Sequence, residues 1–159
     1  GMAQRGGTVI SHLKIGDFQS PLIRPGSADL LIVLKSENLM QHQGFLKPSG
    51  KAIVNASNEL LTQKIAEDGP PQSSSSNAST TDCHDDTFCP ISIDADALAE
   101  KNGHPGAVNL YMLGAALSVA PICGLEAIKQ QVEKRLKGKK ETLIDLAVTS
   151  LEKGFSAIS

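Results

Sequence analysis

The sequence is poor in aromatic residues, in cysteine and in long apolar runs. Phe, Tyr and Trp make up 3% of the 159 residues, and Trp is absent, so stacking platforms for bases or sugars are not expected. Three cysteines without a CxxC pair argue against a disulfide framework and against a complete four-cysteine metal site. They suit a reducing compartment. The sequence therefore predicts a protein held together by its apolar core.

Membrane and nucleic-acid partners are also disfavoured. The longest uncharged stretch, residues 105–125, is interrupted by Pro121 and by three glycines, and the N-terminus lacks a basic start followed by an apolar run. The formal charge is only -2, and the lysines are expected to lie scattered over the surface rather than clustered. The sequence therefore predicts no basic patch that would bind nucleic acid or anionic lipid. We predict a cytoplasmic protein with one domain over residues 1–159, because this length and a hydrophobic fraction of 40% are ordinary for a single core.

The most informative stretch is residues 27–55. Residues 28–34 form an almost unbroken apolar run, which predicts a buried strand. Ser36 can cap a short helix ending near Gly44, residues 47–50 have turn composition, and residues 51–55 predict a second buried strand. Two buried strands joined by a helix indicate a βαβ crossover. The fold class is therefore α/β, and we expect a three-layer α/β/α architecture.

The segments on either side predict a mixed, mostly parallel sheet with one irregular insertion. Residues 8–15 alternate in the period of a half-buried strand, and Gly16 and Asp17 have the composition of a tight turn, so residues 18–22 are expected to return antiparallel. Residues 67–87 are rich in serine and poor in apolar side chains, which predicts a disordered insertion.

The C-terminal half is predicted to hold one strand and several helices. Residues 91–93 resemble a short strand, and Asp94 can cap a helix that closes at Gly103. Residues 107–120 are apolar all round, which indicates a helix buried between neighbours, with Gly114 allowing close approach. Two amphipathic helices follow, over residues 125–136 and from residue 143 to a stop at Gly154.

Cysteine and histidine suggest a metal site only weakly. Cys83, His84 and Cys89 have the residue types of a zinc or iron site, but two thiols in a disordered insertion are too few for a closed one. Cys123 lies beside Ile122 and is expected to be an inert buried sulfur. A metal-sensing protein that uses Cys83, His84 and Cys89 remains an alternative, and metal analysis of the purified chain would test it.

The N-terminus offers a better candidate site. In Arg5-Gly6-Gly7 a guanidinium stands beside two glycines, so charge and bare backbone could approach a phosphate or a partner chain. The alternative is an exposed arginine in a loose terminus.

Several motifs in order resemble one family. Residues 1–7, Gly-Met-Ala-Gln-Arg-Gly-Gly, resemble the GMxQRGG signature of beta subunits of indolepyruvate:ferredoxin oxidoreductases, within the gamma-type domain of 2-oxoacid:ferredoxin oxidoreductases that act on pyruvate, ketoisovalerate or 2-oxoglutarate. The similarity continues through residues 20–31, 46–50, 93–95, 103–109, 113–115 and 152–155. It covers nearly the whole chain outside the insertion. The family's first strand, glycine-rich loop and helix are not matched, which suggests an N-terminal truncation and an exposed sheet edge.

The resemblance implies a subunit that is inactive alone. In such enzymes thiamine diphosphate with magnesium, 4Fe-4S clusters and coenzyme A support the oxidative decarboxylation of a 2-oxoacid to an acyl-CoA, with electrons passed to ferredoxin. We expect this chain to bind none of these cofactors by itself, and to pack against the catalytic chain that carries thiamine and clusters. Gln4, Arg5, Gly6 and Gly7 are the candidate contacts to substrate, coenzyme A or that chain, and Asn109 is a weaker one.

Two further expectations concern partners. A sheet edge without its neighbouring strand predicts a homodimer when the chain is isolated. A stand-alone nucleotide- or coenzyme A-binding α/β module is the alternative function, and tight binding of either ligand without a partner chain would favour it.

Overall fold

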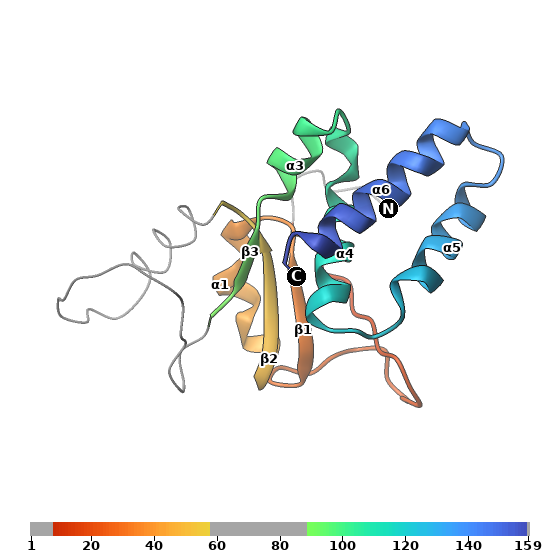
Figure 1. Cartoon of the computed structure of the whole chain (residues 1–159). Helices are drawn as coiled ribbons and strands as arrows, with labels where there is room; N and C mark the ends of the chain where they lie inside the picture. The colour runs from red at the N-terminus through yellow and green to blue at the C-terminus, as the bar shows by residue number, and fades with distance from the viewer. Residues whose placement is uncertain (1–7, 58–88, 159) are drawn as a thin grey trace, which may run out of the picture.

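A parallel sheet of three strands lies at the centre of the structure (Figure 1). The computed structural model describes residues 8–57 and 89–158. The sheet order is β1 (Ala28–Val33), β2 (Leu46–Asn55) and β3 (Ile91–Ile93). Helices cover both faces, so the predicted three-layer α/β class is confirmed. The insertion expected at residues 67–87 lies outside the described residues.

Side chains alternate across β2 and so divide the core into two parts. Ile53 points to a cluster with α4, whereas Ala52 and Val54 point to the opposite face, where they pack with Leu39 of α1 (Leu39–His42). This alternation follows from the two-residue period of a strand. A strand that is apolar at consecutive positions therefore needs cover on both faces, which explains the layers.

The predicted βαβ crossover is confirmed, but its connection is irregular. Short 3-10 turns, η1 (Ser36–Asn38) and η2 (Gln43–Phe45), stand on either side of α1 instead of one continuous helix. The turn predicted at residues 47–50 was wrong, because these residues belong to β2. The register shifts there: Ala28 pairs with Leu46 whereas Leu30 pairs with Lys51, so turn-forming residues are accommodated in an irregular part of the strand.

The antiparallel hairpin predicted for residues 8–22 was also wrong. Gly16 does have positive φ, as a turn glycine should, but the described residues on either side of it form no strand. We call residues 8–24 the arm. It is held by a hydrogen bond from the amide of Ile23 to Nδ1 of His12 and by the edge-on contact of His12 with the Phe45 ring. The described sheet is consequently parallel throughout rather than mixed.

The helix that follows β3 begins as the sequence predicted. The Asp94 carboxylate accepts a hydrogen bond of 2.9 Å from the amide of Ala97 and so caps α3 (Ala95–Lys101). Gly103 closes this helix with φ of 73°, the left-handed conformation that favours glycine. A 3-10 turn, η3 (Pro105–Ala107), then leads into α4 (Val108–Val119).

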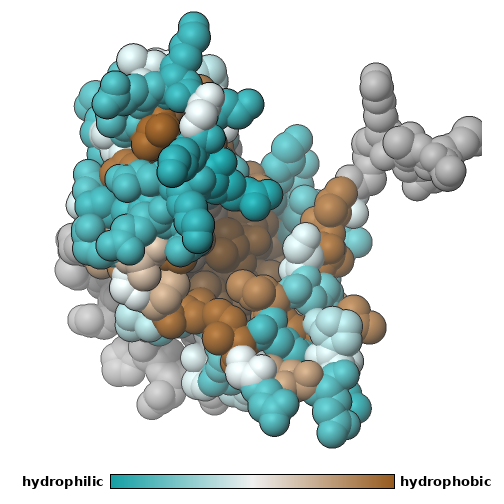
Figure 2. Space-filling view, turned by 90° about the vertical axis from the view of Figure 1, so that its right-hand side faces the viewer, coloured by the Kyte–Doolittle hydropathy of each residue, from teal (hydrophilic) through white to brown (hydrophobic). Residues whose placement is uncertain are grey.

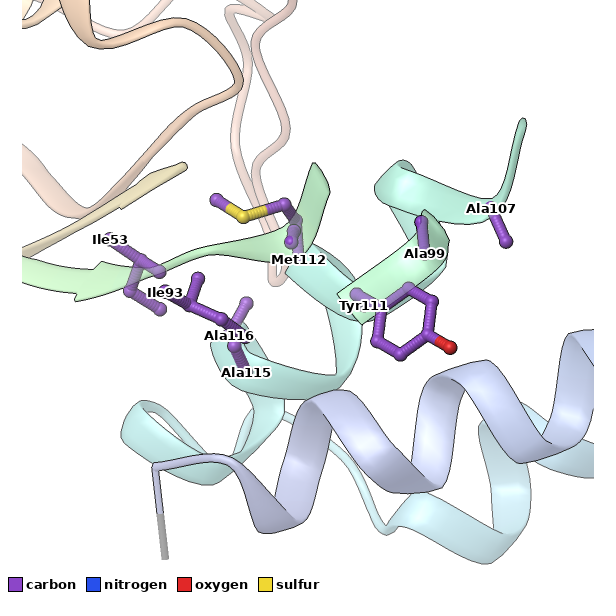
Figure 3. Close-up of a cluster of buried hydrophobic side chains, with 9 residues drawn as sticks. Ile53, Ile93, Ala99, Ala107, Tyr111, Met112, Ala115 and Ala116 are labelled. Atoms are coloured by element: carbon purple, nitrogen blue, oxygen red, sulfur yellow. The ribbon is translucent and has the colours of Figure 1, made fainter. Parts of the chain in front are cut away.

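The buried helix expected near residues 107–120 is α4. It contacts the sheet on one side and α6 (Glu141–Ser156) on another, which explains why apolar residues lie on all its sides beyond the first turn. Figure 3 shows Ala115 and Ala116 of this helix beside Ile53 and Ile93 of the sheet, and Tyr111 farther along the cluster beside Ala99 of α3. The sequence placed the end of the last helix at Gly154, which was wrong. The helix continues to Ser156, because Gly154 serves instead to bring α6 against α4.

The helix α5 (Leu125–Leu136) packs on α6, and none of its residues is buried. Lys129 joins these two helices, with Nζ 2.6 Å from Oε1 of Glu126 and 2.7 Å from Oε1 of Glu152. The hydrogen bond to Glu126, and then that to Glu152, raise the pKa of Lys129 well above its ordinary value. The ammonium group of Lys129 therefore stays protonated, and both ion pairs persist, as the pH rises into the alkaline range.

Removing the hydroxyl of Tyr111 is expected to leave the fold as stable or to stabilise it by about 1 kcal/mol. The side chain is completely buried, and its oxygen has no hydrogen-bond partner among the described residues. Tyr111→Phe removes that unsatisfied group and keeps the ring. Chemical unfolding followed by circular dichroism measures the difference. Tyr111→Ala is the reference, because loss of the ring should cost about 3–5 kcal/mol. A loss above ~1 kcal/mol in Tyr111→Phe would show that the hydroxyl is satisfied after all.

Candidate functional site

The described residues form an open pocket where β2 and β3 end. Its volume is about 410 Å³. Ligands of α/β proteins bind beyond the carboxyl ends of parallel strands, so this is the position at which the fold itself predicts a site. The polar lining comes from Ser57, Ser92, Asp94 and Lys101, and the apolar lining comes from Ala56, Ile93, Ala97, Leu98 and Ala157.

The polar groups of this pocket are limited in what they can do. Asp94 already accepts the amide of Ala97, so its carboxylate is tied to the start of α3. Lys101, at the end of the same helix, adds one exposed cation. One carboxylate and one ammonium at the mouth of an open pocket can orient a small polar group. They do not supply an activated nucleophile with its base.

Asn55 fixes the geometry of this edge of the sheet. Its side-chain amide donates to the carbonyl of Leu34 at 3.2 Å and to Oδ2 of Asp96 at 2.9 Å, and its Oδ1 accepts the amide of Ala95 at 2.9 Å. The residue is buried, so these bonds replace water. One side chain thereby joins the segment after β1, the end of β2 and the start of α3. Local sequence patterns do not reveal this role, because the partners of Asn55 come from distant segments of the chain.

Most of the site residues proposed from sequence lie outside the described residues, so the structure does not test whether they form one site. Gln4, Arg5, Gly6 and Gly7 lie outside the described residues, as do Cys83 and His84. Asn109 is exposed in the first turn of α4 and does not line the pocket. These assignments therefore stay predictions. The pocket could have been found from sequence by asking which polar residues follow each predicted strand, since Ser57 and Asp94 both do.

The cysteines differ from what the sequence suggested. Cys89 is disulfide-bonded, a pairing that the odd cysteine count did not predict, and a sulfur in a disulfide is not a thiolate ligand. Cys123 is free and exposed, so the expectation of a buried sulfur was wrong. It lies in the connection between α4 and α5, where the chain turns at the surface.

The holoenzyme cofactors do not fit the described part of this chain. Within residues 8–57 and 89–158, His, Cys, Asp and Glu side chains nowhere gather in threes that could hold a metal ion. A 4Fe-4S cluster needs four thiolates, and the diphosphate of thiamine needs a magnesium ion held by oxygen ligands. Neither donor set is present in that part of the chain.

A second feature of the surface is apolar. The arm and β1 expose several large aliphatic side chains. Figure 2 shows apolar surface gathered in a hollow on the side of the molecule that lies at the right of Figure 1. Isolated exposed apolar residues are ordinary, but a contiguous group marks a contact surface. No helix of the described residues combines the length and apolar character needed to cross a bilayer.

Comparison with known proteins agrees with the fold. Residues 1–157 match the family model described as pyruvate ferredoxin/flavodoxin oxidoreductase. Two curated relatives, from Archaeoglobus fulgidus and Methanothermobacter thermautotrophicus, are both named indolepyruvate oxidoreductase subunit IorB. They are 29% and 26% identical over 98% and 99% of this chain and over 76% and 78% of their own lengths.

A solved structure extends the comparison to three dimensions. The pyruvate oxidoreductase subunit PORC of Thermotoga maritima superimposes with a TM-score of 0.61 at 23% identity, over 83% of this chain. The match spans 64% of that subunit, so this chain corresponds to less than two thirds of its length. At this identity the likeness concerns the fold.

Proposed function

Because the chain belongs to the pyruvate ferredoxin/flavodoxin oxidoreductase family, we propose that it works as a beta- or gamma-type subunit of a 2-oxoacid:ferredoxin oxidoreductase. The match over residues 1–157 is the observation that carries this proposal, and it confirms the resemblance drawn from the GMxQRGG signature. Indolepyruvate is the first substrate to test, since both curated relatives are named for it. The proposed location is the cytoplasm.

The described residues support an accessory role. They offer neither the thiolates for an iron-sulfur cluster nor a set of ligands for magnesium. We therefore assign both electron transfer through clusters and the thiamine-dependent reaction to a partner chain. A subunit without the reaction centre can still shape the cavity into which substrate or coenzyme A enters. We propose that Gln4, Arg5, Gly6 and Gly7 contribute to this contact, with Asn109 as a further candidate.

Coexpression with the large chain tests the proposal. Neither chain alone should reduce a viologen dye in the presence of a 2-oxoacid and coenzyme A, whereas the purified complex should. Arg5→Ala in the complex should raise KM for the oxoacid or coenzyme A, because a guanidinium positions an anionic ligand. Arg135→Ala is the matched control, since Arg135 is exposed on α5.

Two results would contradict this function. One is activity of this chain without a partner. The other is failure to form a complex with any thiamine-binding chain, together with tight binding of coenzyme A or a nucleotide to the isolated chain in a calorimetric titration. The second result would establish the stand-alone binding module in its place.

A further inference from the structure

The turn between α5 and α6 concentrates positive charge. Five of the 15 basic residues of the chain fall within residues 134–140, so the expectation of scattered lysines was wrong for this turn. All five side chains are exposed, and none forms an ion pair with another of the described residues. Figure 1 shows the turn at the edge of the molecule, at the end of the two helices that lies farther from the sheet. A partner can therefore reach it.

The helix ends explain only part of this charge. Lys134 and Arg135 lie in the last turn of α5 and Lys137 is its C-cap, where cations interact favourably with the negative end of the helix dipole. Lys139 and Lys140 stand instead at the start of α6, where cations are unfavourable. Lys140 is the N-cap of α6 and its side chain caps no amide of that helix. The stability of the helices therefore does not account for the lysines that lead into α6.

The turn holds its lysines close together on an ordered backbone. The amide of Lys139 donates to the carbonyl of Leu136 at 2.9 Å, and Gly138 has φ of 91°, the left-handed conformation that favours glycine. The Cα atoms of Lys137 and Lys140 are at most about 11 Å apart, because consecutive Cα atoms are separated by about 3.8 Å. This distance is comparable to the Debye length of about 8–10 Å at moderate salt, so the charges act together on one ligand.

Acidic residues bound the cationic turn on both sides. Glu133 precedes it on α5, Glu141 and Asp145 follow it on α6, and all three side chains are exposed. The formal charge of the whole chain is -2 in spite of the turn, so the remaining surface is acidic. An extended polyanion, such as nucleic acid or the plane of an anionic membrane, would meet these carboxylates as well. A compact acidic patch would meet the lysines alone.

The surroundings of the turn add no recognition of bases or lipid tails. Residues 125–150, all of which the structure describes, contain no aromatic residue, whereas single-stranded nucleic acid stacks its bases on aromatic rings. Binding to a membrane surface takes several large apolar side chains beside the cations. Leu143, 45% exposed, is the one exposed large apolar side chain in this range. The turn therefore offers charge and little else, which suits a carboxylate-rich protein surface.

We propose that Lys137, Lys139 and Lys140 form a docking site for an acidic patch on the surface of a partner protein. Opposite charges speed the encounter of two proteins and orient them, and salt screens this attraction. A lysine ammonium is a mobile point charge rather than a planar fork, so the site fits several carboxylates of a surface instead of one bidentate group. This inference goes beyond the proposed function, because it concerns a surface apart from residues 4–7 and from the pocket.

A fluorescently labelled octaglutamate peptide is the probe, and octaglutamine is its uncharged reference. Anisotropy titration with the full-length chain should show binding of octaglutamate that weakens as NaCl rises from about 20 to about 200 mM. The variant Lys137→Gln/Lys139→Gln/Lys140→Gln should bind the peptide at least about tenfold more weakly at the lower salt concentration. Its urea midpoint should equal or exceed that of the native chain, because the change removes mutual repulsion and no ion pair.

The matched control is Lys14→Gln/Arg24→Gln/Lys35→Gln. It removes the same charge from the arm and from the segment just beyond β1, and so lowers the net charge equally without touching the turn. Its affinity for octaglutamate should fall by less than about threefold, because distant exposed charges are largely screened. Circular dichroism of both triple variants confirms that they are folded.

Three results would overturn the proposal. The first is binding of octaglutamate no tighter than that of octaglutamine, and the second is equal weakening by the two triple variants. The third is tighter binding of a single-stranded octanucleotide, or of vesicles of phosphatidylserine and phosphatidylcholine, that the turn variant abolishes; it would assign these lysines to nucleic acid or to a membrane. The proposed function is tested by the activity of the complex, so either proposal can fail without the other.

Discussion

Replacing Gly114 with alanine is expected to lower the free energy of unfolding by more than about 3 kcal/mol, or to prevent folding. A Cβ at this position would lie 2.1 Å from the carbonyl oxygen of Leu151 and 2.7 Å from the amide nitrogen of Phe155. Both atoms belong to the backbone of α6, so no change of rotamer relieves the clash. The two helices would have to separate, and α4 would lose its packing between α6 and the sheet.

Gly154 makes the same contact from the other side. Its added Cβ would lie 2.1 Å from the carbonyl oxygen of Tyr111. Gly154→Ala should therefore cost about as much as Gly114→Ala. Both substitutions open one crossing, so the double variant should cost less than the sum of the single variants.

Urea unfolding followed by circular dichroism measures these effects. Gly106→Ala is the matched control, because its Cβ would meet nothing within 4 Å and its φ is not positive. That variant should lie within about 0.5 kcal/mol of the native chain or be slightly more stable. If Gly114→Ala cost less than ~1 kcal/mol, the close approach of α4 and α6 would be refuted.

The contact between α4 and α6 illustrates what the sequence could and could not predict about the fold. An apolar run on all sides of a helix indicates burial, and a glycine within it indicates close approach, so α4 and the role of Gly114 were predicted correctly. At Gly154 the same pattern predicts a helix end, because glycine commonly ends helices. Its actual role depends on which helix lies across it, and that is a tertiary relation that local periodicity does not contain.

The strands show the same division. Strands were predicted at residues 28–34, 51–55 and 91–93, because short segments rich in branched apolar residues are a local signal, and the structure has strands in all three places. The arm was predicted as a hairpin from equally good alternation, yet it forms no strand in the described structure. Alternation states which side chains share a face, but not whether a neighbouring strand is available to pair with them.

The candidate pocket was less predictable than the fold. Asp94 was identified only as a helix cap, and Lys101 was not singled out, because their proximity depends on β2 and β3 ending at the same edge. Family resemblance directed attention to residues 4–7 instead. The family resemblance thus points to residues 4–7, whereas the geometry points to the pocket beyond β2 and β3. The Arg5→Ala variant tests only the role of residues 4–7.

Replacing Asn55 with alanine is expected to cost about 2–4 kcal/mol and to loosen the edge of the sheet at the pocket. The substitution leaves the fully buried amide of Ala95 without its acceptor and the carbonyl of Leu34 without this donor. Asp96 is exposed, so water can replace the bond that it loses, and most of the cost arises at Ala95. Hydrogen exchange should rise at the start of α3, while α5 exchanges as before.

Asn55→Asp separates the acceptor role of this side chain from its donor role. A carboxylate still accepts the amide of Ala95, but it cannot donate to Leu34 and it faces the carboxylate of Asp96. Burial and the nearby negative charge would raise the pKa of the new carboxyl above its value in the unfolded chain. This variant should therefore be least stable at neutral pH, and its deficit relative to the native chain should shrink as the pH falls through that raised pKa. Asn109→Ala, at an exposed asparagine, is the control and should change stability by less than about 0.5 kcal/mol at every pH. Equal costs for Asn55→Ala and Asn109→Ala would show that the bonds of Asn55 do not hold the edge of the sheet together.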